Sequence, residues 1–267
     1  MDLHKMTDLE IVEQWYADGY EDTRLNRSQS KRVEFLTNAR FIEKYLRPGD
    51  KILDVGAGAG EYSLYFARKG HRVCAVEPAE GNLRAFRKKM RPEDSVELSK
   101  GNALDLSLYE NGTFDVVLLF GPLYHLREER DRLQCIREAK RVCKSDGFIF
   151  FAFISNDMVF LTEFCKDERF FTEGEYNKET FKLHDLPFVF HTVDACRELL
   201  AKGGIHILEE VASDGASELL GAHIDSLDEA NYRQYLQYHF YICQKPELLG
   251  MSNHLLFIGE QTHGHEI

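Results

Sequence analysis

Ile52-Leu53-Asp54-Val55-Gly56-Ala57-Gly58-Ala59-Gly60 is a short apolar run that ends in three alternating glycines and leads into a helix-forming segment. Glycine takes positive φ without steric cost and lets the backbone approach a ligand, and the free amides of a helix start attract anionic groups. A dinucleotide-binding turn would have a further glycine at position 61, which is Glu61 here. The pattern therefore predicts a strand, a nucleotide-binding turn and a helix, and it disfavours NAD.

Apolar runs and helical periodicities alternate downstream of this turn, as a doubly wound parallel sheet requires. Lys144–Gly147 is predicted to end one of the helices in a glycine-bearing turn. The fold class is therefore α/β. The predicted strands are 51–55, 72–77, 95–100, 114–120, 147–153, Ile205–Val211 and Leu255–Ile258, and the predicted helices are 60–69, 79–90, 128–144 and 194–202.

The order of these motifs resembles that of the class I S-adenosylmethionine-dependent methyltransferases. The first motif of that family is an acidic residue, an apolar residue and alternating glycines, which Asp54–Gly60 matches without a gap. The resemblance continues in Val73–Glu77, Gly101–Ala103 and Phe114–Leu119 and covers about residues 50–153. It implies a Rossmann-like, seven-stranded, mostly parallel sheet with an antiparallel last strand, S-adenosyl-L-methionine as cofactor, and methyl transfer as activity.

The N-terminal segment has apolar residues at helical spacing over 8–46, and Pro48-Gly49-Asp50 ends it. We expect an N-terminal helical cap over 1–48 and an S-adenosylmethionine-binding domain over 49–267. By analogy with the family, that domain carries an inserted lid at about 154–190 and a helical insertion at about 213–250.

The candidate cofactor site lies at the carboxyl ends of the strands. Asp54 would order the glycine turn or receive the cofactor's ammonium group. Glu77 would accept the ribose hydroxyls or be a solvated acid at a strand end. Asn102 replaces an acidic residue that binds the adenine amino group in relatives; its amide oxygen can accept that bond, or the residue makes a plain turn. The candidate cofactor-binding residues are Asp54, Gly56, Ala57, Gly58, Gly60, Glu77, Asn102, Ala103, Leu104 and Phe120.

The candidate acceptor site follows the fourth strand, where Gly121-Pro122-Leu123-Tyr124-His125 resembles a subgroup of small-molecule methyltransferases. Methyl transfer from a sulfonium is a direct displacement, so the protein mainly aligns the reactants and excludes water. His125 would remove a proton from the acceptor or only hydrogen-bond the backbone. Tyr124 would orient the acceptor or pack on the cofactor. Both are the candidate catalytic residues, and no metal site is expected.

Aromatic residues are concentrated in the expected lid. With Trp15, Tyr16 and Tyr20 they would enclose an apolar acceptor, or they would be ordinary core residues that hold the insertion on the sheet. His184 and His191 lie among them, and His263 and His265 follow the last strand. The aromatic residues of this segment are Phe153, Phe160, Phe164, Phe170, Phe171, Tyr176, Phe181, Phe188 and Phe190.

Charge and composition limit the classes of substrate and partner that the chain can be expected to bind. A formal net charge of -12 disfavours DNA or large RNA as substrate. The six cysteines have no metal-binding spacing and are predicted to be reduced core residues. Neither a signal peptide nor a membrane helix is apparent, so a cytoplasmic monomer or homodimer with a small-molecule acceptor is expected. The alternatives are a nicotinamide-dependent oxidoreductase, which the glycine spacing opposes, and a non-catalytic cofactor-binding module that acts through protein contacts.

Overall fold

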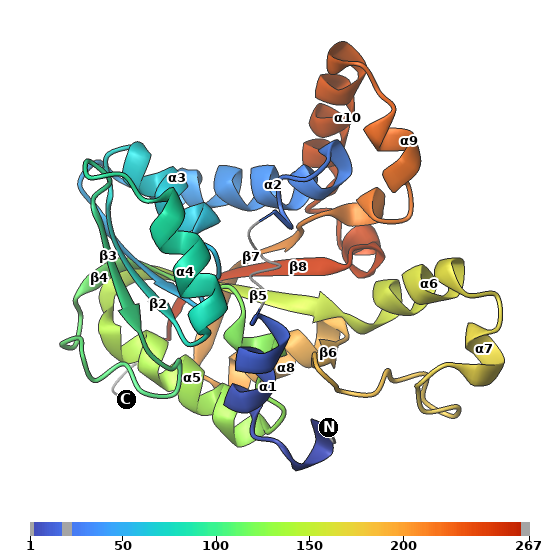
Figure 1. Ribbon diagram of the computed structural model, residues 1–267, viewed down its shortest axis with the longest axis horizontal. Coiled ribbons are helices and arrows are strands. Elements are labelled where there is room, and N and C mark those ends of the chain that lie inside the picture. The colour runs from blue at the N-terminus through green and yellow to red at the C-terminus, as the bar shows by residue number, and fades with distance from the viewer. Residues whose placement is uncertain (1–2, 18–22, 263–267) are drawn as a thin grey trace.

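The computed structural model of the protein describes residues 3–17 and 23–262 (Figure 1). The predictions about Tyr20, His263 and His265 concern residues outside these ranges. The described chain forms a three-layer α/β structure, in which helices cover both faces of one central sheet. None of its helices in these ranges is long and apolar enough to cross a membrane.

The sheet has the strand order β3-β2-β1-β4-β5-β8-β7, and the two-residue strand β6 pairs with β5. Strand β8 runs antiparallel to both of its neighbours, β5 and β7, whereas the pairs from β3 to β5 are parallel. This confirms the predicted mostly parallel sheet with an antiparallel last strand. The strands are β1 Lys51–Val55, β2 Arg72–Glu77, β3 Val96–Lys100, β4 Phe114–Leu119, β5 Cys143–Ser155, β6 Phe190–His191, β7 Ile205–Ala212 and β8 His254–Gln261.

The helices segregate to the two faces of the sheet. Apolar residues of α5 and α8 pack on one face, and those of α2 and α3 pack on the other. The helices are α1 Asp8–Trp15, α2 Gln29–Tyr45, α3 Glu61–Arg68, α4 Glu80–Lys89, α5 Glu129–Val142, α6 Asn156–Lys166, α7 Phe170–Glu173, α8 Val193–Lys202, α9 Gly221–Asp225 and α10 Glu229–Ile242, with short 3₁₀ helices η1 Leu3–Lys5, η3 Pro122–Tyr124, η4 Gly215–Ser217 and η5 Pro246–Met251.

Two N-terminal helices begin at well-formed caps. Thr7 accepts a hydrogen bond from the Glu10 amide, and the Glu10 carboxylate accepts one from the Thr7 amide, which is a capping box for α1. Ser28 caps α2 through the Lys31 amide. These caps fix where the two helices start, and both helices carry residues of the cavity described below.

The predicted glycine turn at Lys144–Gly147 is wrong, because strand β5 already starts at Cys143. The register of β5 against β4 shifts between Phe114 and Val116, so the start of β5 is bulged. Gly147 is required because β5 approaches the Asp115 backbone closely there: a Cβ at this position would lie 2.7 Å from the Asp115 carbonyl oxygen.

Another correction concerns the cysteines: all six are free, but Cys165 on α6 is exposed and is not a core residue.

The segment 154–190 forms α6 and α7 and projects at one end of the sheet, on the right in Figure 1. Phe160, Tyr176 and Leu183 form a separate cluster, which favours the interpretation of these aromatic rings as structural. Phe188 differs, because its ring packs edge-on against Trp15 and also contacts His125. His184 is exposed beside Glu175, and His191 is buried against Phe153.

Candidate functional site

A cavity of about 430 Å³ opens at the carboxyl ends of the strands, around the point where the strand order reverses between β1 and β4. Its walls come from the turn after β1, the end of β2, the loops after β3 and β4, helix α1 and the start of α2. No residue of 154–190, all of which the structure describes, lines this cavity. Helix α1 contributes Leu9 and Val12 to the wall of the cavity, and its C-cap residue Tyr16 lines the cavity as well.

The glycine turn after β1 adopts left-handed backbone conformations at each of its three glycines. The φ angles are 77° at Gly56, 55° at Gly58 and 83° at Gly60. A Cβ on Gly56 would lie 2.9 Å from the Pro122 ring, so the β1 and β4 loops approach closely there. Gly60 does not line the cavity, because it caps α3 and its Cα faces the Phe86 ring at a distance that leaves no room for a Cβ.

Asp54 is buried at the end of β1 with one of its oxygens unsatisfied. Oδ2 accepts a hydrogen bond from the Ser63 hydroxyl at 2.6 Å, whereas Oδ1 has no hydrogen-bond partner among the described residues. Burial and the nearby Glu77 carboxylate raise the pKa of Asp54 to about 7. A buried carboxylate oxygen without a donor is costly, and a ligand ammonium group would supply the donor. The site therefore fits the amino-acid part of the expected cofactor.

Glu77 is buried at the end of β2, which removes the interpretation of a solvated acid. Its Oε2 accepts from the Gly58 amide at 2.8 Å, and its Oε1 accepts from the Ala79 amide at 2.9 Å and the Asn82 side chain at 3.1 Å. The carboxylate thus joins the glycine turn to the start of α4. Gly58 and Glu77 both line the cavity, so a ligand bound there would lie beside this carboxylate.

Asn102 forms a turn at the end of β3. Its Oδ1 accepts a hydrogen bond from the Leu104 amide at 3.0 Å, as the turn interpretation predicts. Ala103 and Leu104 follow on the same wall of the cavity, and Phe120 lies at the end of β4 with its ring 4.9 Å from that of Tyr62. Apart from Gly60, every candidate cofactor-binding residue lines this one cavity.

The two candidate catalytic residues also line the cavity, at the end of η3. The Nε2 atom of His125 is 3.0 Å from the Tyr16 hydroxyl, and its ring packs on Phe188. Burial lowers the pKa of His125 to about 4, so the ring is neutral near pH 7. The Nε2 atom is thus engaged with Tyr16, the residue that caps the end of α1. His125 connects the β4 loop to α1, and its catalytic role stays a prediction.

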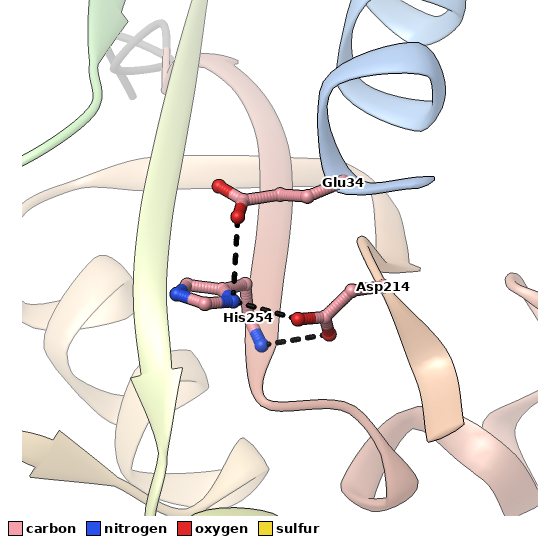
Figure 2. A group of neighbouring side chains, drawn as sticks. All are labelled: Glu34, Asp214 and His254. Atoms are coloured by element: carbon pink, nitrogen blue, oxygen red, sulfur yellow. Dashed lines mark hydrogen bonds and ion pairs between the residues drawn. The ribbon is translucent and has the colours of Figure 1, made fainter. Parts of the chain in front are cut away.

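A charged cluster at the other end of the cavity was missed in the sequence (Figure 2). The Nδ1 atom of His254 lies 2.7 Å from Asp214 Oδ2 and 3.5 Å from Glu34 Oε2. Arg24 donates to Glu34 at 2.7 Å, which anchors that carboxylate. Although burial opposes the charged ring, the carboxylates of Glu34 and Asp214 raise the pKa of His254 to about 9.

The sequence signal for this cluster was weak. His254 is the last of three polar residues, Ser252-Asn253-His254, before the apolar run Leu255–Ile258, and its partners Glu34 and Asp214 are far away in the chain. The only available signal was position: β8 pairs antiparallel with β5, which brings the first residue of β8 opposite Ile154 at the carboxyl end of β5.

Comparison with known proteins supports a methyltransferase domain in this chain. A family model described as a methyltransferase domain matches residues 53–151. The demethylmenaquinone methyltransferase of Lysinibacillus sphaericus is 32% identical over 108 residues, 39% of this chain and 44% of that protein. The ubiquinone biosynthesis O-methyltransferase of Hahella chejuensis is 27% identical over 149 residues, 55% of this chain and 59% of that protein. The chain thus spans about half the length of these curated relatives.

A solved structure extends the likeness over nearly the whole chain. Magnesium protoporphyrin IX methyltransferase from Synechocystis PCC 6803, with bound S-adenosylhomocysteine, superposes with a TM-score of 0.59 at 13% identity, covering 96% of this chain and 100% of that one. Such a likeness shows the fold. The family model supports a methyltransferase domain over residues 53–151. Arg24, Glu34, Asp214 and His254 lie outside the matched residues.

Proposed function

We propose that this chain is an S-adenosylmethionine-dependent methyltransferase that acts on a small-molecule acceptor by direct displacement. The observation that carries the proposal is the unsatisfied Oδ1 of Asp54, a residue that lines the same cavity as Glu77 and the glycine turn. A cavity of about 430 Å³ is within the size range of small-molecule sites, about 300–1,000 Å³.

Each candidate residue has a role in this proposal. Asp54 holds the ammonium group, Glu77 accepts the ribose hydroxyls, and Asn102, Ala103 and Leu104 form the adenine wall. Gly56 and Gly58 let the backbone approach the ligand, with Ala57 between them and Phe120 on the cavity wall, whereas Gly60 serves only to start α3. The cofactor, when bound, supplies an electrophilic methyl group on a sulfonium sulfur. Tyr124 and His125 border the place where the acceptor would align with it.

The surroundings of the cavity favour a small acceptor. Helix α1 is held across one side by the Asp8 carboxylate, which accepts from the Arg127 amide at 3.0 Å and pairs with its guanidinium. The segment 1–48 acts as a cap in this proposal, and a large nucleic acid is disfavoured by the charge of -12. We further propose a cytoplasmic monomer or homodimer.

The first test is cofactor binding. Calorimetry with S-adenosylhomocysteine should give saturable one-site binding to the intact chain, and NADH should give none. Gly58→Val should abolish this binding, because a β-branched residue is strained at a φ of 55° and the Gly58 amide also binds Glu77. Gly112→Val, at an exposed glycine with a φ of 63°, is the matched control and should leave the affinity unchanged. Equal affinity in wild-type protein and Gly58→Val would count against the proposed site.

The acceptor would then be sought by a screen for transfer of labelled methyl groups to a metabolite library. NADH-dependent oxidation or reduction of a library compound, or a protein that binds S-adenosylhomocysteine without any methyl transfer, would favour one of the two alternative functions over the proposed one.

A further inference from the structure

The charged end of the cavity lies beyond the residues that are proposed to hold the cofactor. Those residues follow strands β1 to β4, whereas His254 begins β8, which is separated from β4 by β5. Two strand spacings of about 4.8 Å place β8 roughly 10 Å from β4. His254 also lines the cavity. In the proposed function, this end of the cavity is therefore left for the acceptor.

The sheet leaves space beside the His254 ring. His254 lies opposite Ile154 in the antiparallel pairing of β8 with β5, and directly opposed residues carry their side chains on the same face of a sheet. Ala152 is two residues before Ile154 on β5, so its side chain lies on that face as well, and it lines the cavity. Because this side chain is a single methyl group, it fills little of the cavity between β4 and the His254 ring.

One nitrogen of the His254 ring is fixed by protein carboxylates. Nδ1 lies 2.7 Å from Asp214 Oδ2 and 3.5 Å from Glu34 Oε2. Asp214 is itself held, because its Oδ1 accepts from the His254 amide at 3.0 Å and from the Ser252 hydroxyl at 2.7 Å. A carboxylate only accepts hydrogen bonds, so Nδ1 carries a proton and the ring keeps one orientation.

The charges around the ring indicate that it is an imidazolium. The charged groups that face it are Asp214, Glu34 and Arg24. The side chains of Asp214 and Glu34 are only 8% and 11% exposed, and a neutral ring would leave one guanidinium to balance two carboxylates. Buried charges require partners, so a second cation completes the cluster. The pKa of about 9 at His254 agrees with this charge count.

The second ring nitrogen is directed away from the cluster. In Figure 2, Nε2 is on the far side of the ring from Glu34 and Asp214. No group of the described chain hydrogen-bonds to it, and the His254 side chain is 20% exposed in a residue that lines the cavity. Nε2 of an imidazolium donates a hydrogen bond and cannot accept one. A ligand that reaches this nitrogen must therefore present an acceptor.

We propose, on the basis of the proposed function, that Nε2 of His254 donates a hydrogen bond to a carbonyl oxygen of the methyl acceptor, which is a small molecule with a ketone, ester or amide carbonyl away from the atom that is methylated. In this role His254 binds and selects the acceptor and takes no proton in the reaction.

The balance of charge in the cluster favours a carbonyl over other groups. Arg24 and the imidazolium balance Glu34 and Asp214, so a neutral carbonyl adds no net charge. A carboxylate would add an unbalanced negative charge beside two buried carboxylates. An ammonium group would place N–H bonds and a positive charge against the imidazolium. A hydroxyl oxygen can accept from Nε2, but its own proton then needs an acceptor that the imidazolium does not offer.

Three probes that share a phenyl ring separate these groups: acetophenone has a neutral carbonyl, benzoate a carboxylate and benzylamine an ammonium group. Each is titrated by NMR at about pH 7 into the intact protein saturated with S-adenosylhomocysteine. We expect acetophenone to bind roughly tenfold more tightly than either of the others, because hydrogen bonds to charged groups are among the stronger ones in proteins. The isotope-labelled carbonyl carbon of bound acetophenone should also show the downfield shift of a hydrogen-bonded ketone.

His254→Leu removes the donor. It should lower acetophenone affinity roughly tenfold and abolish the carbonyl shift, while S-adenosylhomocysteine affinity stays within about twofold. His206→Leu, at an exposed position of the adjacent strand β7, is the matched control and should change neither. If His254→Leu does not fold, because it leaves Asp214 buried without its partner, Ala152→Val takes its place. This variant keeps the charged cluster, and its larger side chain should lower acetophenone affinity by filling the space beside the ring.

The acceptor found in the library screen gives a second readout. It should contain a carbonyl group, and its KM should rise roughly tenfold in His254→Leu while kcat changes less, because the lost contact binds the acceptor and does not exchange a proton. An acceptor without a carbonyl group, or a loss of kcat with no change in KM, would overturn the inference.

The binding experiment separates the two proposals. A wild-type protein that does not bind S-adenosylhomocysteine would remove the proposed function, and this inference with it. Normal S-adenosylhomocysteine binding would leave the proposed function intact, and three results would then overturn the inference alone. These are no acetophenone binding, tighter binding of benzoate or benzylamine than of acetophenone, and the same acetophenone affinity and carbonyl shift in His254→Leu as in wild-type protein.

Discussion

Two carboxylates in the cavity, Asp54 and Glu77, differ in the number of donors that reach them. Glu77 accepts at least three hydrogen bonds, two of them from backbone amides. Asp54 accepts one side-chain bond, from Ser63, and leaves one oxygen unsatisfied. Burial destabilises the ionised form of Asp54 more than its hydrogen bonds from Ser63 stabilise it, so the pKa of this carboxyl rises. Glu77 is organised before a ligand arrives, whereas Asp54 becomes fully paired only with a ligand cation.

Cofactor affinity should therefore depend on pH through Asp54. The free protein binds a proton at Asp54 below its pKa of about 7, and the ligand ammonium group needs the ionised form. We expect S-adenosylhomocysteine affinity to rise from about pH 6 to about pH 8 and then level off, with proton release on binding at the lower pH. Calorimetry in buffers of different ionisation enthalpy measures both effects. Asp54→Asn should bind more weakly at about pH 8 and show a flat profile; a sloping profile in that variant would assign the titration to another group.

Removal of the Glu77 charge should weaken the same binding. Glu77→Gln keeps the shape of the side chain but replaces one carboxylate oxygen with an amide nitrogen, which cannot accept a hydrogen bond. The variant therefore cannot accept charge-assisted hydrogen bonds from both the Gly58 amide and a ribose hydroxyl. Hydrogen bonds to charged groups contribute about 1.5–3 kcal/mol, so we expect S-adenosylhomocysteine affinity to fall roughly tenfold to a hundredfold. Glu97→Gln, an exposed carboxylate on the neighbouring strand β3, is the control. Equal losses in the two variants would point to net charge and not to a ribose contact.

Helix α1 is the element that connects the cofactor loops to the acceptor side. It contacts the loop after β4 through the pair of Asp8 and Arg127 and through the Tyr16 hydroxyl at His125. The helix has few buried residues of its own, Ile11 and Val12, so these polar contacts decide where it lies. Opening of α1 is a route by which an acceptor could reach the cavity.

The contact between Tyr16 and His125 can be tested by substituting each of the two residues in turn. We expect His125→Ala and Tyr16→Phe each to slow methyl transfer by a similar factor, roughly tenfold, because both release α1, and to leave S-adenosylhomocysteine affinity unchanged. Steady-state kinetics of the two variants and of the double variant measure this. If His125→Ala were slower than Tyr16→Phe by a further factor of roughly 10², His125 would exchange a proton with the acceptor, as the sequence-based hypothesis allows.

The elements differ in how far the sequence predicts them. The bounds of β1 and β2 agree with the prediction, because each strand is an apolar run that begins after turn residues and ends at a glycine or an acid. The start of β5 was not predicted, since Gly147 is typical of a turn but here allows a bulge to pack on Asp115. The cofactor end of the cavity follows from local motifs. The charged cluster does not, because Glu34, Asp214 and His254 meet only through tertiary structure.

At the scale of the whole molecule, the cluster of Glu34, Asp214 and His254 joins the N-terminal helix layer to the C-terminal strands. Glu34 comes from α2, Asp214 from the connection after β7, and His254 from β8 (Figure 2). Burial opposes the ionised form of each carboxylate, yet Arg24 and His254 hold the pKa of Glu34 below its usual range, and His254 does the same for the pKa of Asp214. The cluster is one network of paired charges, and its contribution to stability must follow its protonation.

The free energy of unfolding should therefore fall at alkaline pH. His254 has a pKa of about 9 in the folded protein and 6.5 when unperturbed, so the folded state binds the proton more tightly. The resulting stabilisation, roughly 3 kcal/mol, is fully present below about pH 6.5 and is lost as the pH rises through about 9. Glu34 and Asp214, whose pKa values are lowered, add stability above about pH 4.5 that is lost in acid. Urea unfolding across this range measures the slope, and His254→Gln should remove its alkaline part. Parallel profiles in wild-type and variant protein would mean that the cluster does not couple the two layers through this proton.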